Sequence, residues 1–222
     1  MKTNNILGIV FANAHDDMLG DLTKNRSMAS VPFGGRYRII DFILSNFANA
    51  GIGHVGLITK TNYLSLTNHL SNGKPWDLDR KKGGLCVLPP YITGAAQYYT
   101  RRLEMLNSVM EFLVSCEEEY VVLGDSDVVT NIDVRAFYKF HETTQADISV
   151  VCARGKKPKG HNNITDFKIS DTGLVQGVSF DDSDDCYYSL DIILVKRELL
   201  INLVKEGISC GQVSLSHGIF ER

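Results

Sequence analysis

Two carboxylates follow a short apolar run near the middle of the sequence. Asp125 and Asp127 come just after Gly124 and the run Tyr120–Leu123, whose length and composition are typical of a strand buried on both faces. A carboxylate at the end of such a strand can hold Mg²⁺ against substrate phosphates, because this ion needs only one or two protein oxygens. Asp125 is therefore the candidate metal ligand. The alternative is that Asp125 or Asp127 caps the following helix.

A glycine pair with basic neighbours has the composition of an anion site. Gly34 and Gly35 precede a predicted helix, and Arg36 and Arg38 follow them. Backbone amides at a helix N-terminus attract phosphate, and glycine lets the backbone approach it closely. The same residues fit equally well a tight turn in which Arg38 bridges to Asp41 or to another carboxylate.

Two further polar segments lack this chemistry. The loop at residues 12–19, after the first predicted strand, contains no glycine and carries Asp16 and Asp17, which would repel a triphosphate. We interpret it as a surface loop without a phosphate role. The dense acidic run within residues 181–185 resembles a metal site, but such a run is more often a solvated loop.

The elements that must position these residues alternate along the chain. Strands are predicted at residues 6–12, 54–59, 120–123 and 147–153, and helices at 37–50, 62–70, 95–115 and 134–142. Beyond Lys156, shorter runs interrupted by polar residues predict hairpin strands and a last helix. The fold class is α/β, with a mixed, mostly parallel sheet flanked by helices and an antiparallel edge. We assign residues 1–210 to one domain and expect 211–222 to be irregular.

Composition excludes several classes of protein. The chain has 222 residues, 44% hydrophobic and 22% charged, which excludes disorder and a bare coiled coil. Its net charge of −3 offers no basic excess for nucleic acid, and no apolar run approaches the ~20 residues of a membrane span. We expect a cytoplasmic protein without nucleic-acid or membrane partners. The five cysteines lie far apart and form no CxxC pair, which predicts free thiols and neither a disulfide framework nor a zinc site.

Several longer motifs resemble a known family. The run Val31–Asn46, VPFGGRYRIIDFILSN, resembles the signature that follows the first strand in bacterial glucose-1-phosphate adenylyltransferases, also called ADP-glucose pyrophosphorylases. Residues 73–80, GKPWDLDR, are similar to the same family in Gram-positive bacteria, and Asp125 falls where its metal-binding Asp is expected. The resemblance covers residues 5–204. It implies a Rossmann-like nucleotidyltransferase domain of the GT-A type, without the β-helix domain that follows it in full-length members.

The sequence departs from the catalytic members of that family at their phosphate-binding residues. Where their GGxGxRL loop has glycines and an arginine, this chain has Asn13, Ala14, Asp16 and Met18. Met28 stands where a lysine faces phosphate, and residues 93–98 replace the nucleotide-contacting GTADAV segment. The candidate remnants of the nucleotide or phosphate site are Arg26, Gly34, Gly35 and Arg36.

These departures predict little or no catalysis, and no residue is assigned a catalytic role. Removing one electrostatic contact to a reacting phosphate costs ~2.7–4 kcal/mol, and here several are replaced together. The resemblance is therefore closest to the GlgD-type subunit, which accompanies and modulates a catalytic subunit in glycogen biosynthesis. An active enzyme using Mg²⁺ at Asp125 and a sensor of ATP or sugar phosphate are the alternatives.

The expected partner is a catalytic glucose-1-phosphate adenylyltransferase subunit or a second copy of this chain. Trp76, with Asp77, Asp79 and Arg80 beside it, has the composition of an interface anchor. Packing of Trp76 within its own chain fits the sequence equally well.

Overall fold

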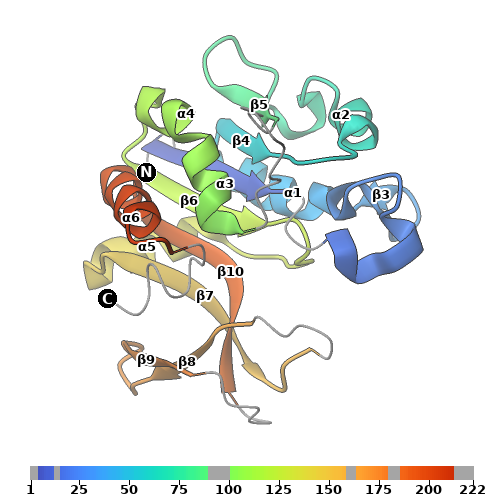
Figure 1. Ribbon diagram of the computed structural model, residues 1–222. Helices are drawn as coiled ribbons and strands as arrows, with labels where there is room; N and C mark the ends of the chain where they lie inside the picture. Colours follow the sequence, from blue (N-terminus) through green and yellow to red (C-terminus); the bar gives the residue numbers. More distant parts are fainter. Residues whose placement is uncertain (1–4, 13–15, 90–100, 159–163, 180–185, 213–222) are drawn as a thin grey trace.

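A computed structural model describes residues 5–12, 16–89, 101–158, 164–179 and 186–212 (Figure 1). Within these ranges one sheet has the strand order β5-β4-β1-β6-β10-β8-β9, with β7 also paired to β10. The strands are β1 (Ile6–Phe11), β4 (His54–Ile58), β5 (Gly84–Leu88), β6 (Tyr120–Asp125), β7 (Ile148–Gly155), β8 (Asp166–Ile169), β9 (Val175–Ser179) and β10 (Cys186–Lys196).

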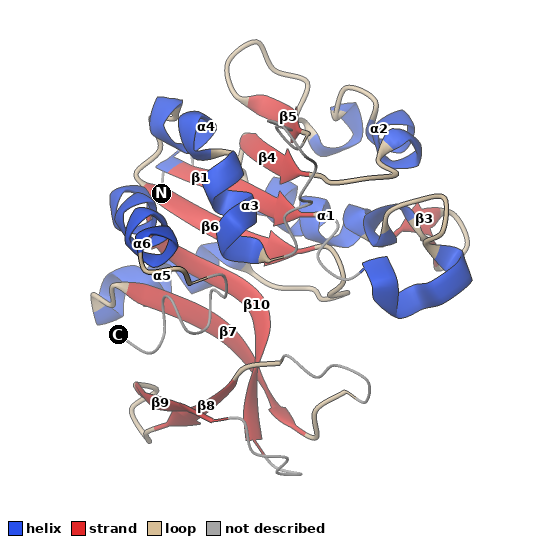
Figure 2. Cartoon of the chain, viewed as in Figure 1, coloured by secondary structure: helices blue, strands red, loops and turns tan. Residues whose placement is uncertain are grey.

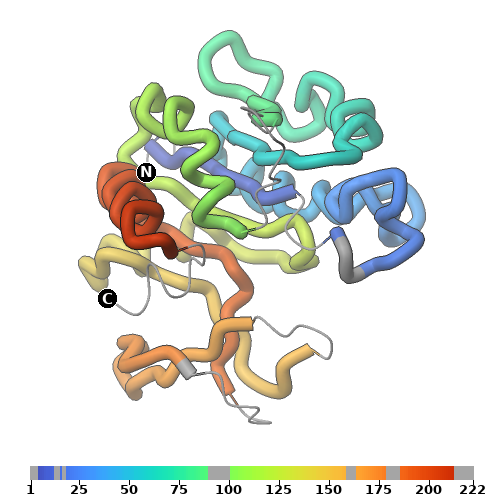
Figure 3. Tube along the Cα trace, viewed as in Figure 1, coloured from blue at the N-terminus to red at the C-terminus, as the bar shows by residue number. Residues whose placement is uncertain are grey.

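The sheet has a parallel half and an antiparallel half, which confirms the expected architecture. Strands β5, β4, β1 and β6 are parallel neighbours, whereas β10 runs antiparallel to β6, β7 and β8. Figure 3 shows β1, β6 and β10 side by side although they are far apart in the sequence. The register of β10 against β7 shifts between Ser189 and Ile193. On the N-terminal side of this irregularity β10 pairs with β8, which in turn pairs with β9, and β8 and β9 extend below the main sheet in Figure 2.

Helices cover both faces of the sheet and bury two hydrophobic clusters. The helices are α1 (Ile40–Ala50), α2 (Leu64–Leu70), α3 (Arg102–Ser108), α4 (Met110–Ser115), α5 (Val134–Thr144) and α6 (Arg197–Ser209). One cluster includes Phe47 of α1 and Tyr138 of α5, and the other includes Leu103 of α3 and Leu200 of α6. None of the helices in the described ranges is long and apolar enough to cross a membrane.

Two predicted helices differ from those observed. The helix predicted at 37–50 begins at Ile40, because Tyr37 and Arg38 form strand β3 (Tyr37–Arg38) and pair with β2 (Pro32–Phe33). The helix predicted at 95–115 is divided into α3 and α4 at Val109, whose φ of −110° and ψ of 21° are not helical. The apolar spacing continues across Val109, since both helices bury residues in the same cluster. Residues 95–100 of that prediction lie outside the described ranges.

Helix α1 packs closely on the central strand at a glycine. A Cβ atom placed on Gly8 would lie 2.8 Å from Cδ2 and Cε2 of Phe47 and 3.2 Å from Cγ2 of Val55. Phe47 is fully buried, so its ring has little room to move. The close approach of α1 to β1 therefore depends on the missing side chain.

We expect Gly8→Ala to lower the free energy of unfolding by about 1–3 kcal/mol, because overpacking forces neighbouring side chains out of their preferred positions. Urea denaturation followed by circular dichroism measures the change. Gly177→Ala in strand β9 is the matched control, since a Cβ atom there meets nothing within 4 Å. Equal stability of the two variants would contradict the packing argument.

Candidate active-site edge and its relatives

Strand β6 ends at Asp125, whose side chain is 1% exposed. Arg102, the first residue of α3, donates from Nη2 to Oδ2 of Asp125 and, at 2.8 Å, to Oδ2 of Asp191. Asp191 lies in β10 at the register shift and has a positive φ of 54°. Its backbone N–H donates to Oγ of Ser189 at 2.9 Å, which holds the turned backbone. The candidate metal ligand is thus part of an ion-pair cluster formed by α3, β6 and β10.

Burial controls the electrostatics of this cluster. It raises the pKa of Asp125 to about 7, and the nearby Asp127 and Asp191 add to the rise while Arg102 opposes it. Burial would lower the pKa of Arg102, but Asp125 and Asp191 raise it above its usual value. Arg102 therefore stays charged and supplies the positive charge that these carboxylates need.

The cluster at the end of β6 contains the kind of ligand atoms that Mg²⁺ binds. Asp125 and Asp191 offer carboxylate oxygens, the ligands that Mg²⁺ prefers, and Oδ1 of Asp125 is buried without a hydrogen-bond partner among the described residues. However, the guanidinium of Arg102 already lies against both carboxylates and compensates their charge. As arranged here, the residues do not fit a bound Mg²⁺ ion unless Arg102 moves.

The loop after β1 uses its carboxylate for internal structure. Oδ1 of Asp16 accepts a hydrogen bond from the backbone N–H of Met28 at 2.7 Å. The side chain of Met28 is only 6% exposed and belongs to the buried turn η3 (Met28–Ser30). An apolar, buried side chain cannot offer a cation to phosphate. Asn13, Ala14 and the side chain of Met18 lie outside what the structure describes.

The glycine pair forms a turn and not the entrance of a helix. Gly34 and Gly35 have φ values of 61° and 91° and join β2 to β3, five residues before α1 begins. Their positive φ values explain the glycines. Arg36 is exposed and lies over the ring of Tyr37, 5.1 Å from its centroid. Of the two roles left open by the sequence, the observed geometry is that of the tight turn.

Arg38 and Arg26 form hydrogen bonds with residues near them in the structure. Arg38 donates from its side chain to Ser65, and its backbone N–H donates to Oδ2 of Asp41 at 3.0 Å. Arg26 is half-buried, and its backbone N–H donates to the carbonyl of Thr23 at 3.4 Å. The described contacts do not bring Arg26 or Arg36 to Asp125. The acidic run within 181–185 and residues 93–98 lie outside the described ranges.

Trp76 packs inside its own chain. Its side chain is 8% exposed, belongs to the same core cluster as Phe47, and meets the ring of His69 edge-on at 6.2 Å between centroids. This burial supports the packing alternative. A role as an interface anchor stays a prediction that no contact described here tests.

Sequence reasoning missed the partners of Asp125. Asp191 interrupts the predicted apolar run 187–195, and a charge inside a buried strand was a signal that could have marked it. Arg102 carried no local signal. It is 23 residues from Asp125 and 89 from Asp191, so only the fold brings the three together.

The fold and the carboxylate at the end of β6 define an α/β domain of the nucleotidyltransferase class. The family model described as "Nucleotidyl transferase" matches residues 8–162, and the chain belongs to this family. This finding confirms the fold class inferred from the sequence.

Several curated relatives within this family carry the name glucose-1-phosphate adenylyltransferase. The chain is 40% identical over 147 residues to a glucose-1-phosphate adenylyltransferase of Pseudothermotoga lettingae, over 66% of this chain and 35% of the relative. It is 36% identical over 151 residues to the enzyme of that name from Clostridium kluyveri, over 68% of this chain and 39% of the relative. The corresponding protein of Bacillus cytotoxicus is 38% identical over 151 residues, 68% of this chain and 40% of the relative. The matched segment thus spans about two fifths of these relatives.

We expect Arg102→Met to destabilise the protein by about 3–5 kcal/mol at pH 8, because it leaves buried carboxylates without a compensating charge. The loss should shrink at pH 5. At pH 5 Asp125 is protonated with or without Arg102, because burial raises its pKa to about 7 in the parent chain. Arg102 opposes that rise, so its removal raises the pKa of Asp125 further. The additional loss therefore builds up only as the pH rises above about 7, where the parent chain releases the proton and the variant retains it.

Urea denaturation at both pH values measures this effect. Arg36→Met, at an exposed arginine, is the matched control and should change stability by less than about 0.5 kcal/mol. A loss for Arg102→Met that is equal at pH 5 and pH 8 would contradict the role of Asp125.

Proposed function

We propose that this chain is a non-catalytic or weakly catalytic regulatory subunit of glucose-1-phosphate adenylyltransferase. The observation that carries the proposal is the ion pair of Arg102 with Asp125 and Asp191. An active nucleotidyltransferase of this kind needs a cation to bring carboxylates and substrate phosphates together. Here the protein's own guanidinium neutralises the carboxylates instead.

The contact between Asp16 and Met28 also supports the proposal of a non-catalytic or weakly catalytic subunit. Phosphoryl transfer depends on positioned positive charge and on backbone amides that face the phosphates. In this chain the amide of Met28 is already bonded to Asp16, and the Met28 side chain is buried. The Asp16 carboxylate and the Met28 backbone N–H therefore bond to each other, and we propose that neither is available to a triphosphate.

Binding of Mg²⁺ is proposed to be weak and to depend on Asp125. The ion must displace Arg102, and the ion pair that it breaks is largely shielded from water. The proposed setting is glycogen biosynthesis in the cytoplasm. The proposed partner is a catalytic glucose-1-phosphate adenylyltransferase subunit or a second copy of this chain.

Alone, the chain is expected to form ADP-glucose from ATP and glucose 1-phosphate much more slowly than about 1 s⁻¹, the lower end of typical enzyme rates. The Clostridium kluyveri relative, assayed identically, is the positive control. Mixing with a catalytic subunit should change that subunit's kinetics and give a mixed species in analytical ultracentrifugation.

Each alternative has its own outcome in this experiment. Turnover by the chain alone at ~1 s⁻¹ or above would show an active enzyme. Binding of ATP or glucose 1-phosphate with no mixed species would favour a sensor of these compounds. Either result would overturn the proposal of a regulatory subunit.

For Mg²⁺, calorimetry in the presence of ATP should show weak binding by the parent chain and tighter binding by Arg102→Met, which removes the competing cation. Asp125→Asn should abolish this binding. Arg36→Met serves as the control for loss of a surface charge. If the parent and Asp125→Asn bind Mg²⁺ equally, the ion is not held at Asp125.

A further inference from the structure

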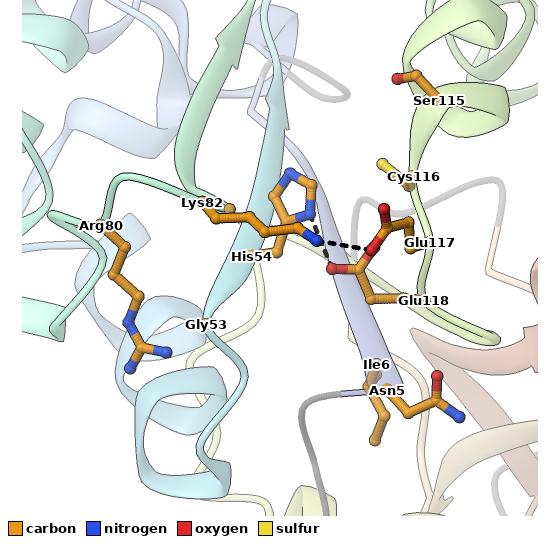
Figure 4. Close-up of a pocket in the computed structure, with 11 residues that line it drawn as sticks. Asn5, Ile6, Gly53, His54, Arg80, Lys82, Ser115, Cys116, Glu117 and Glu118 are labelled. Carbon is orange, nitrogen blue, oxygen red and sulfur yellow. Dashed lines mark hydrogen bonds and ion pairs between the residues drawn. The ribbon is translucent and has the colours of Figure 1, made fainter.

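A second polar cluster lies at the opposite end of the parallel strands from Asp125. A cavity of about 610 Å³ opens where β1 and β4 begin, and it is lined by His54, Cys116 and Glu118 among others (Figure 4). His54 is the first residue of β4, and the other two residues belong to the segment between α4 and β6. The cavity is therefore separate from the carboxylate cluster at the carboxyl end of β6.

Three different ligand atoms converge in this cavity. A ring nitrogen of His54, Sγ of Cys116 and a carboxylate oxygen of Glu118 all lie within 4.8 Å of one another. Nδ1 of His54 is 2.9 Å from Oε1 of Glu118. Oε2 of Glu118 is buried and has no hydrogen-bond partner among the described residues. The His54–Glu118 contact alone thus leaves part of this buried carboxylate unsatisfied.

The surrounding structure holds the three side chains in place. Arg197, the first residue of α6, donates from Nε to the carbonyl of Glu118 at 2.7 Å and from Nη1 to the carbonyl of Leu113 at 3.1 Å. These bonds fix the segment that carries Cys116 and Glu118. The His54 ring meets Phe112 edge-on at 5.4 Å between centroids. Its other nitrogen, Nε2, lies 3.9 Å from Sγ of Cys86, so Nδ1 faces the cluster.

We propose that His54, Cys116 and Glu118 bind a zinc ion that retains one coordination position open to the cavity. An imidazole, a thiolate and a carboxylate are all zinc ligands, and three protein ligands with one open position are a recurrent zinc arrangement. A thiolate favours Zn²⁺ over Mg²⁺ or Ca²⁺. One thiolate and one carboxylate neutralise the charge of Zn²⁺, which suits a partly buried site.

In the metal-free chain, burial, assisted by Glu118, raises the pKa of Cys116 to about 12, so this thiol must lose a proton before it can bind a metal. The pKa of His54 is also raised, mainly by its contact with Cys86. Zinc would replace protons on both groups, and it would link the start of β4 to the segment before β6. No local spacing pattern indicated this site, because His54 lies more than 60 residues before the other two proposed ligands.

The test uses the whole chain, stripped of metal under reducing conditions, and Zn²⁺ alone as the probe. Calorimetry should show one equivalent bound by the parent and a rise in melting temperature with added Zn²⁺. Co²⁺ in its place should give the absorption of a thiolate-bound, tetrahedral ion. Cys116→Ser and Glu118→Gln should each weaken zinc binding by at least about 10–100-fold, the loss already typical of supporting residues around a metal.

Cys210→Ser is the matched control, because Cys210 is an exposed thiol at the C-terminal end of α6 and should leave binding unchanged. Circular dichroism of each variant shows whether it is folded, and Glu118→Gln decides the question if Cys116→Ser is not. Parent-like zinc binding by the folded variants, or loss of binding in Cys210→Ser, would overturn the proposal. So would the absence of stoichiometric zinc binding by the parent.

Discussion

The charge of one arginine organises the carboxyl edge of the sheet. Asp125 ends β6 and Asp191 lies in the neighbouring strand β10, so the sheet itself brings two acidic side chains together. Two such charges repel strongly where water is largely excluded, unless a cation lies between them. Arg102 supplies that cation from the first turn of α3. One ion-pair cluster at the carboxyl edge of the sheet therefore links β6, β10 and α3.

The loop after β1 also has its carboxylate bonded within the chain. The Asp16 carboxylate accepts a hydrogen bond from the backbone N–H of Met28, whose side chain is buried. At the amino edge, Glu118 is paired with His54 and lines a cavity. The two edges of one sheet thus differ in the partner of their carboxylate, which is a guanidinium at Asp125 and an imidazole at Glu118.

Local patterns in the sequence were sufficient for most of the fold. The run 120–123 was expected to be a buried strand, and β6 includes it and ends at Asp125. The helix expected to end at Ala50 does end there, and the following Gly51 has a φ of 82°. These features are decided by hydrophobic spacing and backbone freedom over a few residues, so they can be inferred without a structure. The change to antiparallel strands beyond Lys156 was visible for the same reason.

The sequence by itself determined the class of fold, the position of Asp125 at a strand end and the loss of positive charge from the loop after β1. Only the tertiary structure decided that Gly34 and Gly35 form a hairpin turn, that Trp76 lies in the core and that Arg102 compensates Asp125. It also decided that His54 meets Glu118. The physical reason is that periodicity reports which face of an element is buried, whereas charge pairing between distant residues depends on strand order and helix placement.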